Sequence, residues 1–157
     1  MIKELAPSDA PLETALLLVF RHLVEGAPMM PVDKNHLHIF QRYLLAYNSF
    51  DVNGMLEMLS DEVNFANYSN GVMTASASNK CEFKELANKG KWIFDERKQE
   101  IVSMRPLENG LEAKIRFLGK LSDEVAKEVH SGHYVEIYGT SKVEFRDRKI
   151  VRLVDRS

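Results

Sequence analysis

Hydrophobic residues recur at two different spacings along this chain, and the change of spacing separates a helical part from an extended part. Over residues 37–47 and 52–59 they repeat every three or four positions, which predicts two amphipathic helices, the second ending near Ser60. Asp33 and Asp51 stand where the N-caps of these helices would lie. Two consecutive helices are therefore expected before the first strand.

The spacing changes to strict alternation after the second helix. Val63, Phe65 and Asn67 alternate with the residues between them up to residue 68, which predicts a strand with these three side chains on one face. Asn70-Gly71 is the residue pair that a two-residue hairpin turn favours. We therefore expect the chain to return directly as a second strand over residues 72–77.

A third helix and a set of long strands complete the expected fold. The helix should run from a cap at Ser78 or Asn79 to about Asp95, unless Gly90 ends it earlier, since a glycine inside a helix costs about 1 kcal/mol relative to alanine. Helices followed by alternating strands predict an α+β layer fold, with a pocket between the helices and a curved sheet. The expected strands are residues 99–105, 111–121, 133–145 and 149–155, with turns at Asn109-Gly110 and Asp147-Arg148 and a polar loop over residues 122–131.

Residues 8–25 predict an additional helix, because their apolar positions form one wide stripe before Gly26. Charged residues cut its apolar run to six consecutive positions, which is too short for a membrane span and unlike a signal peptide. We therefore expect residues 1–31 to be a helical extension that docks on a domain formed by residues 32–157.

Composition narrows the possible partners. The chain has 157 residues, 45% of them apolar, a net charge of −2 and a pI near 6.2, so nothing in its charge favours a nucleic acid. Cys81 is the single cysteine, and no Cys/His spacing indicates a metal or another cofactor, which together favour a reducing cytoplasm. Small molecules and a second copy of the chain are the expected partners, with no membrane.

Two motifs resemble those of the nuclear-transport-factor-2-like superfamily, and within it the ketosteroid-isomerase-like and SnoaL-like proteins. The first is QRY, ending at Tyr43, and the second is N-x-x-D-x-x-G at Asn48, Asp51 and Gly54. The resemblance implies a cone-shaped α+β barrel, in which three helices pack on a curved, mixed but mainly antiparallel sheet. It also implies a homodimer formed through the polar face of that sheet.

The resemblance extends to the site but not to the isomerase reaction. In ketosteroid isomerases the tyrosine of QRY donates a hydrogen bond to the steroid oxygen, which implies this role for Tyr43. The positions of the general base and of the second acid correspond to Asn67 and Ser141. An amide cannot accept and return a proton at neutral pH, so ketosteroid isomerase activity is not expected.

The candidate ligand-binding residues are polar side chains predicted to face the pocket. Tyr43 and Tyr47 lie on the covering helix, and strand parity points Asn67 and Ser141 inward, where they would orient a ligand or else satisfy each other or a buried water. Further candidates are Asp155, on the last strand, and His133, at the start of the preceding strand.

Each of these further candidates has an alternative interpretation. Limonene-epoxide-hydrolase-like proteins place an aspartate near the position of Asp155, but they also need an Arg-x-Asp pair, and the stretch Lys114-Ile115-Arg116 has no acid. Asp155 would then be a solvated strand end or a salt-bridge partner of Arg152 or Arg156. His133 resembles a dehydratase or cyclase acid/base, or it is simply a partly exposed histidine without a carboxylate partner.

Three functions remain open from the sequence. The first is a pocket protein that binds a small, apolar, oxygen-bearing molecule, and the second is a non-enzymatic dimerisation domain with a residual cavity. The third is an isomerase, cyclase, dehydratase or epoxide-hydrolase-like enzyme with a base other than Asn67. An open pocket on the order of a few hundred cubic ångströms beside Tyr43 and Asn67 would favour a pocket protein over the dimerisation domain.

Overall fold

The first three of the described helices begin at the caps that the sequence predicts. In this computed structural model, which describes residues 31–157, Asp33 Oδ1 accepts hydrogen bonds from the backbone N–H groups of Asn35 and His36 at 2.8 and 3.2 Å. Asp51 Oδ1 accepts from Gly54 N at 2.9 Å, and Asn79 caps its helix in the same way. These bonds satisfy N–H groups that a helix start leaves free. The helices are α2 (Lys34–Asn48), α3 (Val52–Glu57), α4 (Lys80–Gly90) and the short α5 (Asp123–Glu128).

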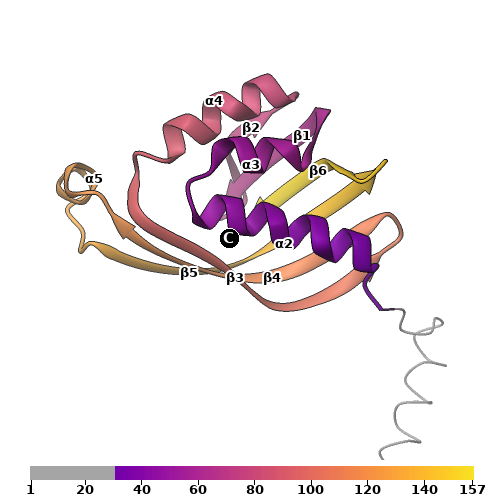
Figure 1. Cartoon of the computed structure of the whole chain (residues 1–157). Helices are drawn as coiled ribbons and strands as arrows, with labels where there is room; N and C mark the ends of the chain where they lie inside the picture. Colours follow the sequence, from indigo (N-terminus) through magenta and orange to yellow (C-terminus); the bar gives the residue numbers. More distant parts are fainter. Residues whose placement is uncertain (1–30) are drawn as a thin grey trace, which may run out of the picture. The chain divides into compact units, whose positions relative to one another are not determined.

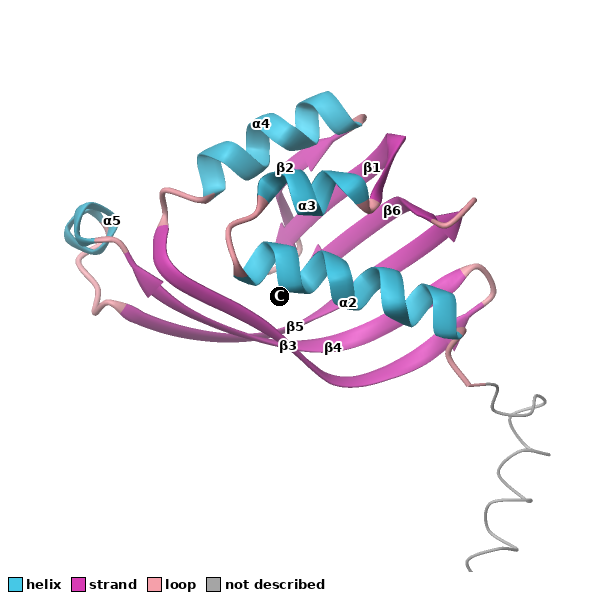
Figure 2. Ribbon diagram, in the orientation of Figure 1, coloured by secondary structure: helices cyan, strands magenta, loops and turns pink. Residues whose placement is uncertain are grey.

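Figures 1 and 2 show α2, α3 and α4 on one side of a strongly curved sheet, with α5 at the far end of the long strands. The sheet order is β2-β1-β6-β5-β4-β3; β1 and β6 are parallel and every other neighbouring pair is antiparallel. The predicted α+β fold with a mixed, mainly antiparallel sheet is confirmed. The strands are β1 (Leu59–Ser69), β2 (Val72–Ala77), β3 (Phe94–Leu107), β4 (Gly110–Leu121), β5 (Tyr134–Arg146) and β6 (Lys149–Arg156).

Two tight turns have positive φ angles at both of their central residues. Asn70 and Gly71 both have positive φ angles, 51° and 80°, as the two-residue hairpin turn requires. Asp147 and Arg148, between β5 and β6, have φ angles of 51° and 62°. Both predicted turns are confirmed.

Several predicted boundaries are wrong. The second helix ends at Glu57 instead of Ser60, and β1 begins at Leu59. The third helix ends at Gly90, and β3 begins at Phe94 because that residue already pairs with Leu121 of β4. Such long-range pairing extends strands beyond the residues whose alternation is visible in the sequence.

Two connections also differ from the sequence-based expectation. The turn between β3 and β4 is formed by Glu108 and Asn109, one residue earlier than predicted, because Gly110 is already paired with Leu107. The expected polar loop over residues 122–131 contains α5, whose Ala126 is buried. The predicted helix at residues 8–25, and its docking, lie outside the described residues.

The core lies between the helices and the concave face of the sheet. Its fully buried side chains come from α2 and from four strands, and the alternate residues Leu111, Ala113 and Ile115 of β4 are all buried. Within the described range, no helix is both long and apolar enough to cross a membrane. The largest fully buried side chains are Phe40, Leu59, Leu111, Ile150, Leu153, Val63 and Val143.

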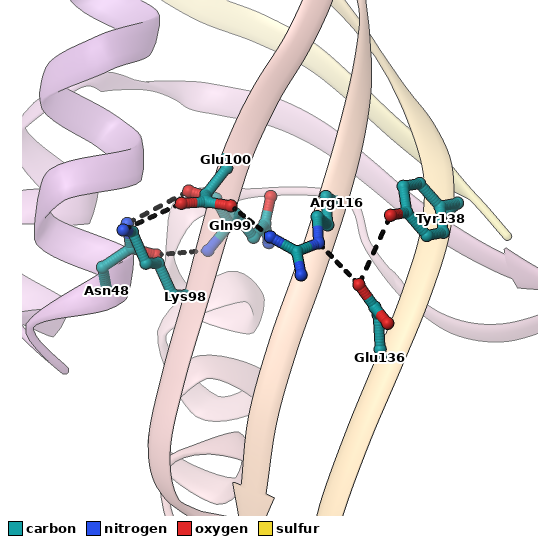
Figure 3. Close-up of polar contacts among 7 residues, drawn as sticks. All are labelled: Asn48, Lys98, Gln99, Glu100, Arg116, Glu136 and Tyr138. Carbon is teal, nitrogen blue, oxygen red and sulfur yellow. Dashed lines mark hydrogen bonds and ion pairs between the residues drawn. The ribbon is translucent and has the colours of Figure 1, made fainter.

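The opposite face of the sheet carries a chain of polar contacts (Figure 3). Arg116 lies at its centre, with Nε 2.6 Å from Glu136 Oε2 and Nη1 3.2 Å from Glu100 Oε1. Lys98 extends the chain on β3, and Tyr138 donates to Glu136 on β5. The charges of this cluster are therefore paired within one chain, which lowers the cost of covering them with a second copy.

The homodimer stays a prediction, and this face is its expected interface. Tyr134 and Tyr138 are exposed on β5, and tyrosine is enriched at interfaces because it buries a large ring and keeps a hydroxyl partner. Light scattering at high micromolar concentration should give twice the 18.0 kDa mass of the chain. Tyr138→Glu should shift the protein toward monomer, whereas an 18 kDa particle for the unchanged protein would contradict the expected dimer.

Candidate functional site

An open cavity of about 560 Å³ lies between the helices and the concave face of the sheet. Tyr43 and Tyr47 of α2 line it, as do Phe65 of β1 and Phe83 of α4, so much of its wall is aromatic. Five of the six predicted site residues line this cavity: Tyr43, Tyr47, Asn67, Ser141 and Asp155.

Three of these residues form one row across neighbouring strands. Asn67 of β1 is the register partner of Asp155 on β6, and Asp155 is the register partner of Ser141 on β5. Neighbouring strands lie about 4.8 Å apart, so the three side chains are held side by side on the concave face. The Ser141 hydroxyl donates a hydrogen bond of 2.6 Å to Asp155 Oδ1.

Asp155 is a carboxylate held inside the cavity wall. Burial raises its pKa from 3.8 to about 6, while the hydrogen bond from Ser141 acts in the opposite direction. The salt-bridge alternative is wrong, because Arg152 pairs with Glu144 and the Arg156 guanidinium lies over the Tyr68 ring at 4.2 Å. Asp155 is also paired on both sides, with Asn67 and Ser141, so it does not lie at a frayed strand end. Asp155 therefore titrates close to the range in which a side chain can serve as a general base.

The two tyrosines of α2 are neutral hydrogen-bonding groups at the cavity. Tyr43 is buried between Phe40 and Phe83, with both ring centroids 6.5 Å away. Burial raises its pKa well above the usual value, and the charge of Asp155 raises it further. Burial also raises the pKa of Tyr47, where the positive charge of Arg97 acts against the shift. Both phenols keep their protons at neutral pH.

Asn67 is tied to the hairpin that it belongs to. Its amide nitrogen donates to Thr74 Oγ1 on β2 at 2.7 Å, and the Thr74 hydroxyl donates back to the backbone oxygen of Asn67 at 3.2 Å. The first bond orients the side chain and leaves its Oδ1 and its second N–H for a ligand.

His133 lies apart from the other five residues. It does not line the cavity, and its Nε2 is 3.0 Å from Oδ1 of Asp123, the first residue of α5. The expectation of a histidine without a carboxylate partner is therefore wrong. Because both side chains are exposed, this contact is a surface pair and contributes little to the cavity.

Arg97 is a cavity residue that the sequence analysis missed. It is 8% exposed, and its Nε–H donates to the backbone oxygen of Tyr47 at 2.9 Å. The guanidinium carbon lies 3.8 Å from the ring centroid of Tyr47 and 4.4 Å from that of Phe50. In the sequence Arg97 lies in the charged run DERKQE, which is typical of a solvated surface. Strand pairing with Gly119 is what turns it inward.

Asn48 explains how α2 is attached to this side of the cavity (Figure 3). Its Oδ1 accepts from Gln99 N at 2.8 Å, and its Nδ2 donates to Gln99 O at 3.2 Å. This pair of bonds joins the end of α2 to β3 next to Tyr47 and Arg97. Asn48, the first residue of the N-x-x-D-x-x-G motif, therefore holds the end of α2 in position and does not line the cavity.

The cavity offers little to a metal ion. Among the described residues, Asp155 is the single acidic side chain on its wall, and no histidine or cysteine of that part of the chain lines it. Across residues 31–157, no group of three or more His, Cys, Asp or Glu side chains is placed to hold a metal. The wall instead carries the carboxylate of Asp155, the guanidinium groups of Arg97 and Arg156, the ammonium group of Lys89 and several neutral donors and acceptors.

Comparison with known proteins identifies the fold. No family model and no curated protein sequence matches the chain. Solved structures do match, among them a SnoaL-like, polyketide-cyclase-like protein from Jannaschia sp. CCS1, with 9% identity, a TM-score of 0.66, and coverage of 82% of this chain and 88% of that one.

Two further structures extend this comparison. A protein with a ketosteroid-isomerase-like fold from Catenulispora acidiphila, solved with trimethylamine, shares 7% identity and covers 80% of this chain and 85% of its own, with a TM-score of 0.64. An epoxide hydrolase from M. tuberculosis that resembles limonene epoxide hydrolase shares 11% identity and covers 78% and 81%, with a TM-score of 0.62.

These matches identify the fold of the chain. The chain has the nuclear-transport-factor-2-like fold, in the form found in ketosteroid-isomerase-like and SnoaL-like proteins. The resemblance seen in the QRY and N-x-x-D-x-x-G motifs is thereby confirmed for the fold.

Proposed function

We propose that this chain binds a small, largely apolar, oxygen-bearing molecule in the cavity and moves a proton on it with Asp155. The observation that carries the proposal is the Ser141–Asp155 pair on the wall of a 560 Å³ cavity, with the pKa of Asp155 raised to about 6. A buried carboxyl group with a pKa near neutrality is typical of a general acid/base. The alternative base that the sequence left open is thus assigned to Asp155.

Each neighbouring group has a part in the proposed reaction. Above pH 6 the carboxylate of Asp155 is ionised, and Ser141 occupies Oδ1, so Oδ2 is the atom that accepts the proton. The proton comes from an activated C–H group or from a water molecule beside the ligand. Tyr43, a neutral phenol, donates to the ligand oxygen that gains negative charge, and Asn67 orients the ligand beside Asp155.

The comparisons support a small-molecule reaction without specifying it. The structural neighbours include a polyketide-cyclase-like protein and an epoxide hydrolase, which differ in their substrates. The open cavity supports this proposal over a dimerisation domain with a collapsed interior. The apolar lining favours a ligand that is mostly hydrocarbon.

Proton transfer can be tested before the substrate is known. Small ketones, lactones and epoxides are incubated with the protein in D₂O, and mass spectrometry follows deuterium uptake at carbon and ring opening. We expect a rate that rises through about pH 6, and a loss of about a hundredfold or more in Asp155→Asn. Asp147→Asn, which changes a carboxylate in the β5–β6 turn, is the matched control and should keep the rate. An equal rate in Asp155→Asn would contradict the proposal.

Ketosteroid isomerase activity is expected to be absent. Asn67 stands at the position of the isomerase base, and its amide cannot carry the proton between two carbons. A spectrophotometric assay with a Δ5-3-ketosteroid should show no isomerisation above background. Asn67→Asp should add little isomerase activity, because Ser141 stands where the isomerases have their second acid. Isomerisation that survives Asn67→Ala would show that the base position is assigned wrongly.

A further inference from the structure

Arg97 carries a buried positive charge that the described protein leaves unpaired. Its Nη2 has no hydrogen-bond acceptor within residues 31–157, and none of the ion pairs of that part of the chain includes it. The side chain is 8% exposed and lines the cavity. A buried ion without an opposite charge is costly, so this arrangement requires an explanation.

The contacts of Arg97 hold the guanidinium without neutralising it. Nε–H is bound by the backbone oxygen of Tyr47, and the rings of Tyr47 and Phe50 lie against the guanidinium. These groups are a neutral acceptor and two π-faces, which orient an arginine and offset part of its desolvation. Burial lowers the pKa of Arg97, but arginine stays charged at neutral pH. The positive charge is therefore directed at whatever enters the cavity.

Arg97 on β3 and Asp155 on β6 are charged residues of the cavity wall, and β4 and β5 lie between their two strands. Asp155 raises the pKa of Tyr43 and of Tyr47, and Arg97 acts on both in the opposite direction. Asp155 and Arg97 do not form an ion pair with each other. A ligand can therefore meet Arg97 at one end and Asp155 at the other, with its apolar body between them.

We infer that the ligand of this cavity is a small apolar carboxylic acid, bound as its anion with the carboxylate against Arg97. This inference rests on the proposed function, because it uses the same cavity. A carboxylate matches the planar fork of a guanidinium and supplies the missing negative charge. Lys89 and Arg156 also line the cavity but are exposed, so Arg97 is the buried positive charge that a ligand anion would meet. The anchored acid presents its other end to Asp155.

The test compares acids with their uncharged counterparts. Isothermal titration calorimetry is carried out with 4-phenylbutanoate and 3-phenylpropanoate and with the primary amide of each. The unchanged protein should bind at least one acid about tenfold or more tightly than its amide, as expected for a charge-assisted contact. Arg97→Met, which keeps an apolar chain of similar length, should weaken the acid about tenfold to a hundredfold and change the amide by less than about threefold.

Control variants separate a local contact from a general effect of charge. Lys98→Met removes the same charge from the next residue, which lies on the opposite face of β3, and should keep the preference for the acid. Arg97→Lys keeps the charge without the planar fork and should bind the acid with intermediate affinity. If Arg97→Met fails to fold, as judged by circular dichroism, Arg97→Lys and Lys98→Met still show whether the acid binds through a local contact with Arg97 or through a general effect of positive charge.

The outcomes distinguish this inference from the proposed function. Equal binding of acid and amide by the unchanged protein, or equal losses in Lys98→Met and Arg97→Met, would overturn the role of Arg97 and leave the cavity as a neutral ligand site. Binding of the amides but not of the acids would also overturn the role of Arg97 and leave the cavity as a neutral ligand site. If none of the four probes binds, both the carboxylate inference and the proposed class of small apolar ligand fail.

Discussion

Asp155→Asn should make the protein more stable at neutral pH, by roughly 2 to 3 kcal/mol in the free energy of unfolding. The folded protein holds the Asp155 carboxyl with a pKa of about 6, against 3.8 for the ordinary value. Folding therefore favours the protonated form, and ionisation of Asp155 destabilises the native state. Asparagine has nearly the same shape, carries no charge, and can still accept the hydrogen bond from Ser141.

The stability gained by Asp155→Asn should depend on pH. Below about pH 4 the carboxyl is protonated in both the folded and the unfolded chain, so the variant and the unchanged protein should be equally stable. Between about pH 4 and 6 the unfolded chain ionises first and the unchanged protein loses stability, and above this window the difference is complete. Urea unfolding at pH 4 and pH 8 measures it. Asp147→Asn should show no such pH-dependent gain, and a difference that is equal at both pH values would contradict the assignment.

Phe40→Ala should destabilise the protein by about 3 to 5 kcal/mol. Phe40 is fully buried on α2, where its ring stacks near that of Tyr43. Removal of the ring leaves a cavity beneath the helix that carries both site tyrosines. Urea unfolding should show a lower midpoint with an unchanged slope, since the surface exposed on unfolding stays similar.

The matched control for Phe40→Ala lies on the same helix. Leu45 is 68% exposed, so Leu45→Ala should change the stability by less than about 0.5 kcal/mol. A small loss in Phe40→Ala, close to that of Leu45→Ala, would show that α2 is not packed on the sheet as described. Ligand binding in Phe40→Ala should weaken too, because the position of Tyr43 depends on the same packing.

Local sequence chemistry determined where the elements of this fold begin and turn. Asp33, Asp51 and Asn79 cap helices because their side-chain oxygens reach backbone N–H groups two or three residues away. Asn70-Gly71 forms its turn because these residues accept positive φ angles. Such interactions involve neighbouring residues only, so the sequence is sufficient to predict them.

The candidate site was partly predictable for a related reason. Alternation along a strand places Asn67, Ser141 and Asp155 on the concave face, and helical spacing places Tyr43 and Tyr47 over it. The alternation shows which face of the sheet a side chain lies on, but it does not show which residue lies beside it on the next strand. The row in which Asp155 lies between Asn67 and Ser141 depends on the parallel pairing of β1 with β6, which joins strands from opposite ends of the domain.

Tertiary structure alone decided the properties on which the proposed function depends. Arg97 stands in a charged run, and the sequence predicts a strand that begins only at Gln99, so the sequence does not indicate Arg97 as a site residue. Pairing of β3 with β4 extends that strand and turns Arg97 into the cavity. His133 was placed near the pocket by its position in the chain, but it pairs with Asp123 at the surface. The pKa of Asp155 follows from its burial, which no local pattern encodes. Caps, turns and parity depend on adjacent residues, whereas charge burial and strand register depend on residues brought together from distant parts of the chain.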